Sequence, residues 1–405
     1  MTEKDQNGIS RRDLIIKGAV VTAGLAASSV LVPARFAIGG QAKVKVGMLL
    51  PYTGTYAKLG SNIRDAMLLR FAEANNMLGG RPIEFVDIDS EAKPAKAQQL
   101  TDKLIKKEKV DFLVGPVHSV VGMAMVKMAR GSRGPITVIP NAGADQLTGV
   151  LCSPNVFRTS FSSYQMGYPG GPAMLEDGHK RVVLMYWNYG FGKQVAAAFK
   201  KSFLPAGGTI IKEIPTPFPK VDFQAYLTEL AALKPDAVYT FYAGGGAVKF
   251  VKDFAAAGLK KSIKLYGAGF LTEGLGAAQG DAAEGVRTIL HYADTLDNPA
   301  NQRFRAAFKS STGSSADVYA VQGYDAGELI LRGMNAVQGD TGARAEMIAA
   351  MESAEIDSPR GKLRFSKSHN PIHDIYLREV VKGENRVVRV AAKAQDDPAT
   401  GCSMA

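Results

Sequence analysis

An alternation of strand-like and helix-like segments, run through twice, constrains the fold more than any other feature of the chain. Short aliphatic runs such as Val44–Leu50 and Arg181–Trp187 each lead into a loop and then into a segment with apolar residues three or four positions apart. Strands and helices that alternate in this way indicate mostly parallel sheets flanked by helices. Because the series restarts near Lys180, we expect an α/β fold with two similar lobes.

The last third of the sequence mixes both patterns, which indicates that the chain returns to complete each lobe. Helical spacing covers residues 318–334, and strand-like runs cover residues 361–365 and 375–380. We therefore expect discontinuous lobes joined by a multi-strand hinge. The predicted N-terminal lobe comprises residues 43–157 and 290–362, the predicted C-terminal lobe comprises residues 158–289 and 363–392, and a polar tail covers residues 393–405.

The first residues have the pattern of an export signal. Two arginines, at positions 11 and 12, precede an apolar stretch from Gly18 to Val32, and small residues around Ala34 suit a signal peptidase. Paired arginines before a modest apolar run are typical of twin-arginine signals, with general secretion as the other route. About 15 apolar residues are fewer than the ~20 that a spanning helix needs. We predict a twin-arginine signal peptide over residues 1–34, cut between 34 and 42, and a soluble protein in the periplasm.

The charge balance and the cysteines narrow the class of protein further. The formal net charge is +11, but Lys and Arg are scattered along the chain, which is typical of a solvated surface and would also attract anionic solutes. We expect no nucleic-acid partner. In an oxidising periplasm, the pair Cys152 and Cys402 favours a disulfide, with two free thiols as the alternative. Such a bond would hold the tail near the end of the first lobe.

The sequence lacks the motifs of catalysis and cofactor binding. No P-loop, G-x-G-x-x-G or G-x-S-x-G spacing occurs. Only His369 and His373 are close together among the histidines, and Pro371 between them prevents a zincin-like helical pair. We therefore expect a binding protein with no enzymatic activity, no cofactor and no metal site.

Polar and aromatic loops follow the predicted strands, and ligands bind at the carboxyl ends of strands in parallel α/β sheets. In the first lobe, Ser119 lies where a helix begins, so its hydroxyl and free backbone N–H groups could receive a carboxylate, with a plain helix cap as the alternative. In the second lobe, the loops after the strands are aromatic and include Tyr189. The loop ends therefore predict a binding site between the lobes.

Several short motifs follow one another in a fixed order through the chain. They are Val46–Tyr56, Phe112–Pro116, Tyr189–Gly192, Asp222-Phe223, Gly280–Gly285 and Gly323–Ala326. In this order and spacing they resemble the leucine/isoleucine/valine-binding family of ABC-transporter solute receptors, which are type I periplasmic binding proteins. The resemblance implies two lobes that close around a small ligand, and a membrane permease with its ATPase as partners.

The resemblance also implies roles for individual residues. Tyr56 and Phe191 stand where the family places aromatic side chains beside the ligand, and Ser119 matches the serine that holds the ligand carboxylate. The pair Asn141-Ala142 matches a small-residue loop in which Gly143 replaces the usual threonine. These positions make the ligand carboxylate the group that the first lobe recognises.

The resemblance weakens where amino-acid binders hold the ligand ammonium group. The acidic residue expected there falls within Ala268–Phe270, and no carboxylate follows before Glu273. An uncompensated buried ammonium group would be costly. The sequence therefore looks unlike an α-amino-acid binder, and the loops 141–149 and 152–155 look closer to receptors linked to aromatic-acid uptake.

We predict a monomeric receptor for a small organic anion, an aromatic or related carboxylate. A branched-chain amino-acid or amide receptor of the same fold, a ligand-sensing module that signals without transport, and a periplasmic enzyme are the alternatives. The candidate ligand-binding residues are Tyr56, His118, Ser119, Asn141, Ala142, Gly143, Tyr189, Phe191, Tyr242, Phe270 and Gln322.

Overall fold

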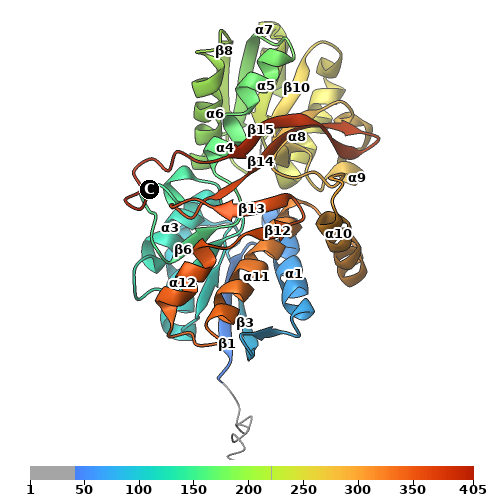
Figure 1. Ribbon diagram of the computed structural model, residues 1–405. Helices are drawn as coiled ribbons and strands as arrows, with labels where there is room; N and C mark the ends of the chain where they lie inside the picture. Colours follow the sequence, from blue (N-terminus) through green and yellow to red (C-terminus); the bar gives the residue numbers. More distant parts are fainter. Residues whose placement is uncertain (1–41, 220) are drawn as a thin grey trace, which may run out of the picture. The chain divides into compact units, whose positions relative to one another are not determined.

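The computed structural model describes residues 42–219 and 221–405 (Figure 1), so the predicted signal peptide lies outside the described residues. Residues 42–405 form one compact unit. Two sheets with flanking helices make up this unit, which confirms the predicted two-lobed α/β fold.

The first lobe contains a six-stranded sheet in the order β2-β3-β1-β4-β5-β6. Its strands are β1 (Val44–Leu50), β2 (Met77–Leu78), β3 (Arg81–Asp89), β4 (Phe112–Val114), β5 (Ile136–Ile139) and β6 (Val156–Arg158). All neighbours pair in parallel except the short β2, which is antiparallel to β3. The loops after β1, β4 and β5 therefore emerge at one edge of the sheet, where a ligand can meet them.

Helices from two distant parts of the sequence cover this sheet. They are α1 (Ala57–Glu73), α2 (Pro94–Asp102), α3 (Ser119–Ala129), α10 (Pro299–Thr312), α11 (Val318–Ala336) and α12 (Arg344–Glu352). α11 lies directly against α1, and a Cβ atom at Gly323 would be only 2.1 Å from the carbonyl oxygen of Ile63. The returning chain thus completes the first lobe, as the mixed pattern of the last third predicted.

The second lobe contains a longer sheet, in the order β12-β13-β14-β11-β10-β9-β7-β8, with β15 paired to β14. Its strands are β7 (Arg181–Trp187), β8 (Thr209–Thr216), β9 (Ala237–Phe241), β10 (Lys264–Ala268), β11 (Arg287–Leu290), β12 (Ile356–Ser358), β13 (Gly361–Phe365), β14 (Pro371–Val381) and β15 (Glu384–Gln395). Its helices are α4 (Ser163–Gly167), α5 (Gly170–Glu176), α6 (Gly190–Phe203), α7 (Gln224–Leu233), α8 (Gly244–Ala256) and α9 (Gly276–Gln279). The run from β8 through β11 is parallel, and β14 adds to it in the opposite direction.

The chain passes between the lobes after β6, after β11 and near β13. The predicted boundaries after residues 157, 289 and 362 remain predictions, and they fall at or within these same strands. β12 hydrogen-bonds to β13 at the end of the second sheet, in the segment where the returning chain crosses between the lobes.

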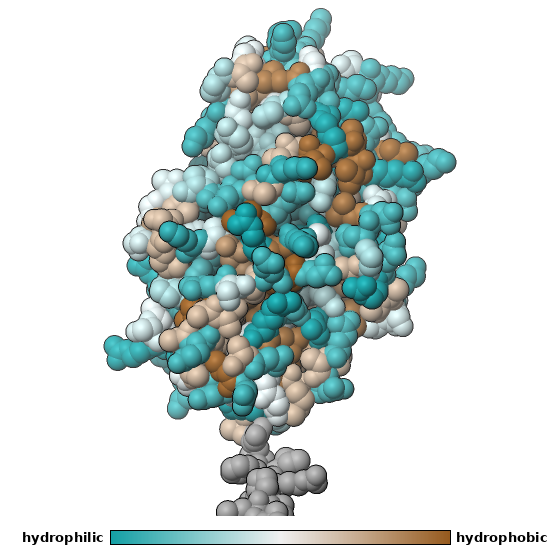
Figure 2. All heavy atoms as spheres, in the orientation of Figure 1, coloured by the Kyte–Doolittle hydropathy of each residue, from teal (hydrophilic) through white to brown (hydrophobic). Residues whose placement is uncertain are grey.

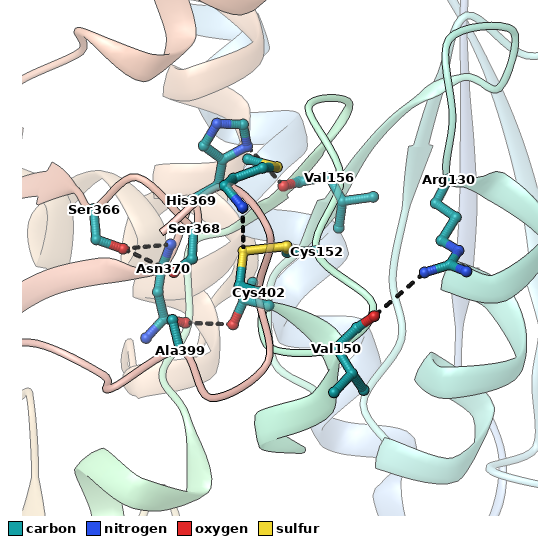
Figure 3. Close-up of a disulfide and its surroundings, with 12 residues drawn as sticks. Arg130, Val150, Cys152, Val156, Ser366, Ser368, His369, Asn370, Ala399 and Cys402 are labelled. Carbon is teal, nitrogen blue, oxygen red and sulfur yellow. Dashed lines mark hydrogen bonds between the residues drawn. A yellow bond between two sulfur atoms is a disulfide. The ribbon is translucent and has the colours of Figure 1, made fainter.

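A disulfide connects the C-terminal tail to the first lobe (Figure 3). The Sγ atoms of Cys152 and Cys402 are 2.13 Å apart, and the two residues are separated by 250 positions. β15 extends to Gln395, so the predicted tail begins as a strand of the second sheet and then crosses to the first lobe. The pairing is the one that the cysteine count favoured.

Polar side chains cover most of the molecular face seen in Figure 2, with hydrophobic residues in small groups between them. Within residues 42–219 and 221–405, no helix is both long enough and apolar enough to cross a membrane.

Candidate functional site

A small pocket lies where the loops of the two lobes meet. Its cavity volume is about 20 Å³, so the closed lobes leave little free space between the lining side chains. It is lined by Tyr56, Leu59, Val117, Ser119, Asn141, Gly143, Phe161, Tyr189, Phe191, Phe241, Ala243, Phe270 and Tyr319. None of these lining residues carries a charge, so the pocket suits a small ligand with a large apolar surface.

Three helices begin at this pocket. Ser119 is the first residue of α3, and Tyr189 and Ala243 are the N-cap residues of α6 and α8. No acidic residue lies in the first turn of any of the three helices. Helix N-termini carry unpaired N–H groups and a partial positive charge. Their convergence gives a neutral pocket a positive electrostatic potential, which favours an anion.

The N-terminus of α3 leaves the hydroxyl of Ser119 free for a ligand. The side chain that caps this helix is that of His118, whose Nδ1 accepts a hydrogen bond from the backbone N–H of Val120 at 3.2 Å. Burial lowers the pKa of His118 to about 4, so the ring is neutral and can accept this bond. Ser119 is buried, and its hydroxyl makes no hydrogen bond with the residues that the structure describes.

Aromatic rings form much of the pocket wall. Phe191 and Phe241 lie edge to face with their centroids 4.6 Å apart, and Phe161 lies 4.8 Å from Phe270. Tyr319, from α11, stacks on Phe270 with the centroids 6.1 Å apart. Such a wall offers both ring faces and ring edges to a flat aromatic guest.

Two tyrosines join the lobes at the mouth of the pocket. The hydroxyls of Tyr56 and Tyr189 are 3.1 Å apart, and the ring of Tyr189 stacks on that of His118 with a centroid distance of 4.8 Å. Burial raises the pKa of both tyrosines, so both phenols remain neutral. The ring of Phe218 packs against the same cluster, with its centroid 5.7 Å from that of Tyr56 and 5.2 Å from that of Tyr189. These contacts belong to a closed arrangement of the lobes.

Two glycines allow this close approach. A Cβ atom at Gly143 would lie 2.4 Å from ring atoms of both Phe161 and Phe191. At Gly244, which has φ +54°, a Cβ atom would lie 2.4 Å from the carbonyl oxygen of Thr55 in the first lobe. A side chain at either position would therefore hold the lobes or the aromatic wall apart.

Glu273, the first carboxylate after the position where amino-acid binders hold the ligand ammonium group, is already occupied. Glu273 is buried, and its Oε1 accepts the backbone N–H of Val318 at 2.7 Å. Its Oε2 accepts a hydrogen bond from Arg378 at 2.6 Å. Burial raises the pKa of Glu273 to about 7, although Arg378 opposes that shift. Glu273 does not line the pocket, so it offers nothing to a ligand ammonium group.

The structure brings together most of the predicted site residues. Tyr56, Ser119, Asn141, Gly143, Tyr189, Phe191 and Phe270 line the pocket. The other four lie just behind this lining. His118 caps α3, and Ala142 is fully buried in the core beside the first sheet. Gln322 does not line the pocket, and its side chain is hydrogen-bonded to that of Asn141.

Tyr242 points away from the pocket, and its neighbour Phe241 lines it instead. The hydroxyl of Tyr242 lies 3.2 Å from that of Thr216, and its ring packs on Phe223 and Phe250. Successive residues at a strand end face opposite sides. The sequence of the loop alone did not determine which of the two residues, Phe241 or Tyr242, faces the pocket.

Sequence reasoning missed Leu59, Val117, Phe161, Phe241, Ala243 and Tyr319. Val117, Phe241 and Ala243 lie within loops that were selected at strand ends but were not chosen as candidate residues, and Leu59 lies shortly after another such loop. Phe161 and Tyr319 had no such signal, because they come from a lobe crossing and from a helix of the returning chain. Within the described part of the chain, no group of three or more His, Cys, Asp or Glu side chains is placed to hold a metal ion.

Two α/β lobes that close a pocket at the carboxyl ends of their parallel strands define a solute-binding receptor. Residues 43–385 match the family described as periplasmic binding protein. The chain is 32% identical over 349 residues to the Leu/Ile/Val-binding protein homolog 6 of Brucella melitensis, covering 84% of this chain and 88% of that one. The chain belongs to the periplasmic binding protein family, whose members are receptors rather than enzymes and act in the periplasm.

Solved structures show the same fold with aromatic acids bound. An ABC-transporter solute-binding protein from R. palustris, in complex with benzoate, is 49% identical, with a TM-score of 0.87 and coverage of 89% of this chain and 100% of that one. A second, from Rhodopseudomonas palustris BisB5 in complex with 3,4-dihydroxybenzoic acid, is 31% identical, with a TM-score of 0.83 and coverage of 88% and 99%. The chain thus has the fold of ABC-transporter solute-binding proteins, in the branch whose neighbours bind aromatic acids.

Proposed function

We propose that this protein is the receptor of an ABC importer for benzoate or a closely related aromatic carboxylate. In this proposal, a twin-arginine signal over residues 1–34 directs export, and the ligand-loaded receptor delivers its cargo to a permease driven by an ATPase. The observation that carries the proposal is a pocket at which three helices begin, and whose lining includes four phenylalanine rings and no charged residue.

The proposed pose follows from the helix N-termini and the phenylalanine rings of the pocket. The ligand carboxylate accepts hydrogen bonds from the hydroxyl and the N–H of Ser119, at the positive end of α3. The ring packs against Phe191 and Phe270, and its apolar surface is thereby removed from water. Tyr56 and Tyr189, one from each lobe, close over the ligand.

The ligand thereby bridges the lobes and favours the closed form. A ligand shifts an open–closed equilibrium only by its differential affinity for the two forms. Ser119 belongs to the first lobe and the phenylalanines to the second, so only the closed form offers both sets of contacts. The closed form is then the state that a permease would recognise.

An α-amino acid fits this pocket poorly. The names of the Brucella relatives make leucine the natural comparison ligand. Its ammonium group would face helix N-termini of the same sign and find no carboxylate among the lining residues, while Glu273 behind them is bonded to Arg378. A buried unpaired ammonium is strongly unfavourable.

Titration calorimetry of the exported protein tests the proposal. Benzoate, 4-hydroxybenzoate and 3,4-dihydroxybenzoate are the acids to compare with leucine, and benzylamine is a control that has a similar ring and the opposite charge. We expect micromolar or tighter binding of at least one acid and no binding of benzylamine. Tight binding of leucine, together with no detectable binding of any of the aromatic acids, would refute the proposed ligand class.

A further inference from the structure

Asn141 is one end of a buried chain of hydrogen bonds that leads from the pocket to a histidine. Its Nδ2 lies 2.7 Å from Oε1 of Gln322, and Nε2 of Gln322 lies 3.2 Å from Nε2 of His291. Gln322, on α11, and His291, directly after β11, are both completely buried. One atom of the Asn141 amide is thus committed to this chain, and the other is left for the pocket that Asn141 lines.

The chain can run in either of two directions, because the O and N atoms of an amide group have nearly the same shape. In the first direction, Asn141 donates to Gln322, and Gln322 donates to Nε2 of His291. The neutral imidazole must then carry its hydrogen on Nδ1. That atom is buried and has no hydrogen-bond partner among the described residues. A buried N–H without an acceptor is rare and unfavourable.

The opposite direction removes this conflict. Nε2–H of His291 then donates to Oε1 of Gln322, and Nε2 of Gln322 donates to Oδ1 of Asn141. Nδ1 of His291 is left with only a lone pair, which is less costly to bury than an N–H group. The amide NH₂ of Asn141 now faces the pocket, where it can donate to an anion.

The surroundings of His291 keep its ring neutral, so a single ring hydrogen decides the direction. Burial lowers the pKa of His291 well below its ordinary value, and the positive charge of Arg360 acts in the same sense. The ring stacks on that of His373 with centroids 4.8 Å apart and planes 5° apart, and Phe161 from the pocket wall lies 5.6 Å away. The ring is therefore held in place as well as neutral.

We infer that His291 and Gln322 are positioning residues that hold the amide of Asn141 as a hydrogen-bond donor toward the ligand carboxylate. Binding of an acid and the Nε2–H tautomer of His291 support each other through Gln322. A ligand with a hydrogen-bond donor in place of the carboxylate favours the reverse direction of the chain. This inference rests on the proposed function, because it requires an acid in the pocket.

The tautomer of His291 can be read directly. The chain has five histidines, so long-range proton–nitrogen correlation spectra of the ¹⁵N-histidine-labelled protein are simple, and the His291 signals are those that disappear in His291→Asn. With benzoate bound, we expect the ring hydrogen of His291 on Nε2. A hydrogen on Nδ1 in the benzoate complex would overturn the inference.

Affinity ratios supply a second, independent readout. Gln322→Met breaks the chain with little change in side-chain size, and we expect it to weaken benzoate binding roughly tenfold. The affinity for benzamide should fall much less in this variant, because the amide group of benzamide can form a hydrogen bond with either orientation of the Asn141 amide. The matched control is Gln279→Met, a buried glutamine whose Nε2 bonds the carbonyls of Ala247 and Leu271, away from the chain. Equal losses for benzoate and benzamide in Gln322→Met would contradict the inference.

The proposed function and the positioning role of His291 and Gln322 would be refuted by different results. If the unaltered protein binds no aromatic acid, the proposed function fails and this inference fails with it. If benzoate binds but His291 keeps its hydrogen on Nδ1, the function stands and only the positioning role is lost.

Discussion

In the proposed pose, Ser119 is the residue whose side chain contributes most to recognition of the acid. Its hydroxyl is buried at the positive end of α3 and is not used by the cap, which His118 provides. Hydrogen bonds to charged groups contribute about 1.5–3 kcal/mol. We predict that Ser119→Ala weakens the binding of an aromatic acid by roughly 10- to 100-fold, measured by calorimetry.

A matched serine provides the control for this substitution. Ser202 is also buried, at the far end of α6, where its hydroxyl donates to the carbonyl of Tyr168 at 2.6 Å. Ser202→Ala should lower stability slightly and leave ligand affinity unchanged. An unchanged affinity in Ser119→Ala would exclude this hydroxyl from the contact with the acid.

At the scale of elements, the N-terminus of α8 limits how closely the lobes approach. A Cβ atom at Gly244 would collide with the carbonyl of Thr55 across the lobes, whereas one at Gly245 would make an ordinary contact, 3.7 Å from Oγ1 of Thr55. We predict that Gly244→Ala weakens ligand binding at least tenfold, because the collision exists only in the closed form. Its positive φ also costs about 1–2 kcal/mol of stability in either form.

Gly245→Ala tests the same helix without the collision. We expect wild-type affinity from it and, in solution scattering, the same compaction on adding ligand that the unaltered protein shows. Gly244→Ala should show no compaction at ligand concentrations that saturate the wild type. Equal behaviour of the two variants would mean that this contact does not control closure.

The sequence predicted elements well wherever a local pattern carried the information. The strands β1, β7 and β9 and the loops after them follow from aliphatic runs that end in glycine, proline or polar residues. The short strand β11 was missed, because a run of four residues without alternating polar and apolar positions gives no clear strand signal. α4 and α5 were missed as well, since they are short helices in the first crossing between lobes.

The site was predicted less completely than the fold for a related reason. Ser119 and Asn141 directly follow strands, so a rule about strand ends finds them. Tyr319 lies in α11, where an aromatic residue at helical spacing looks like any other core residue. Its position at the pocket depends on how α11 packs after the chain returns, which is tertiary information.

At the scale of the whole molecule, the contact between lobes responds to pH through Asp145. Asp145 lies in the first lobe, shortly after the pocket residue Gly143. Its carboxylate accepts a hydrogen bond from the backbone N–H of Tyr164 in the second lobe. Burial, followed by the negative charge of Asp397, raises the pKa of Asp145 from 3.8 to about 6, although the hydrogen bond from Tyr164 and, after it, the charge of Arg158 oppose this shift. The closed form therefore binds a proton more readily than an open form that exposes the carboxyl group.

The sign of the pH dependence follows from this difference. Closure is favoured as pH falls through 6, because the folded, closed state then gains a proton that the open state does not hold. We predict that acid affinity rises by at most about fourfold from pH 7.5 to 5.5, where a carboxylic acid ligand of ordinary pKa is still ionised. Asp145→Asn should remove this dependence, and a wild-type affinity that falls over the same range would contradict it.

The disulfide also acts on the whole molecule, because it closes a loop of 250 positions. Crosslinks of this kind typically contribute about 2–4 kcal/mol to the free energy of unfolding, mainly through the unfolded chain. We predict a loss of that size in the double variant Cys152→Ala/Cys402→Ala, measured by urea denaturation. Reductant should destabilise the wild type and leave the double variant unaffected. Equal stability of the two proteins without reductant would contradict this prediction.

The convergence of three helix N-termini has a consequence for how such receptors diversify. In the proposed function, the attraction for an anion comes largely from peptide dipoles, which no single amino-acid replacement can delete. The phenylalanines that line the pocket are ordinary side chains, free to change in size and polarity. New cargo preferences can therefore arise by remodelling the aromatic wall while the grip on the acid group is inherited intact.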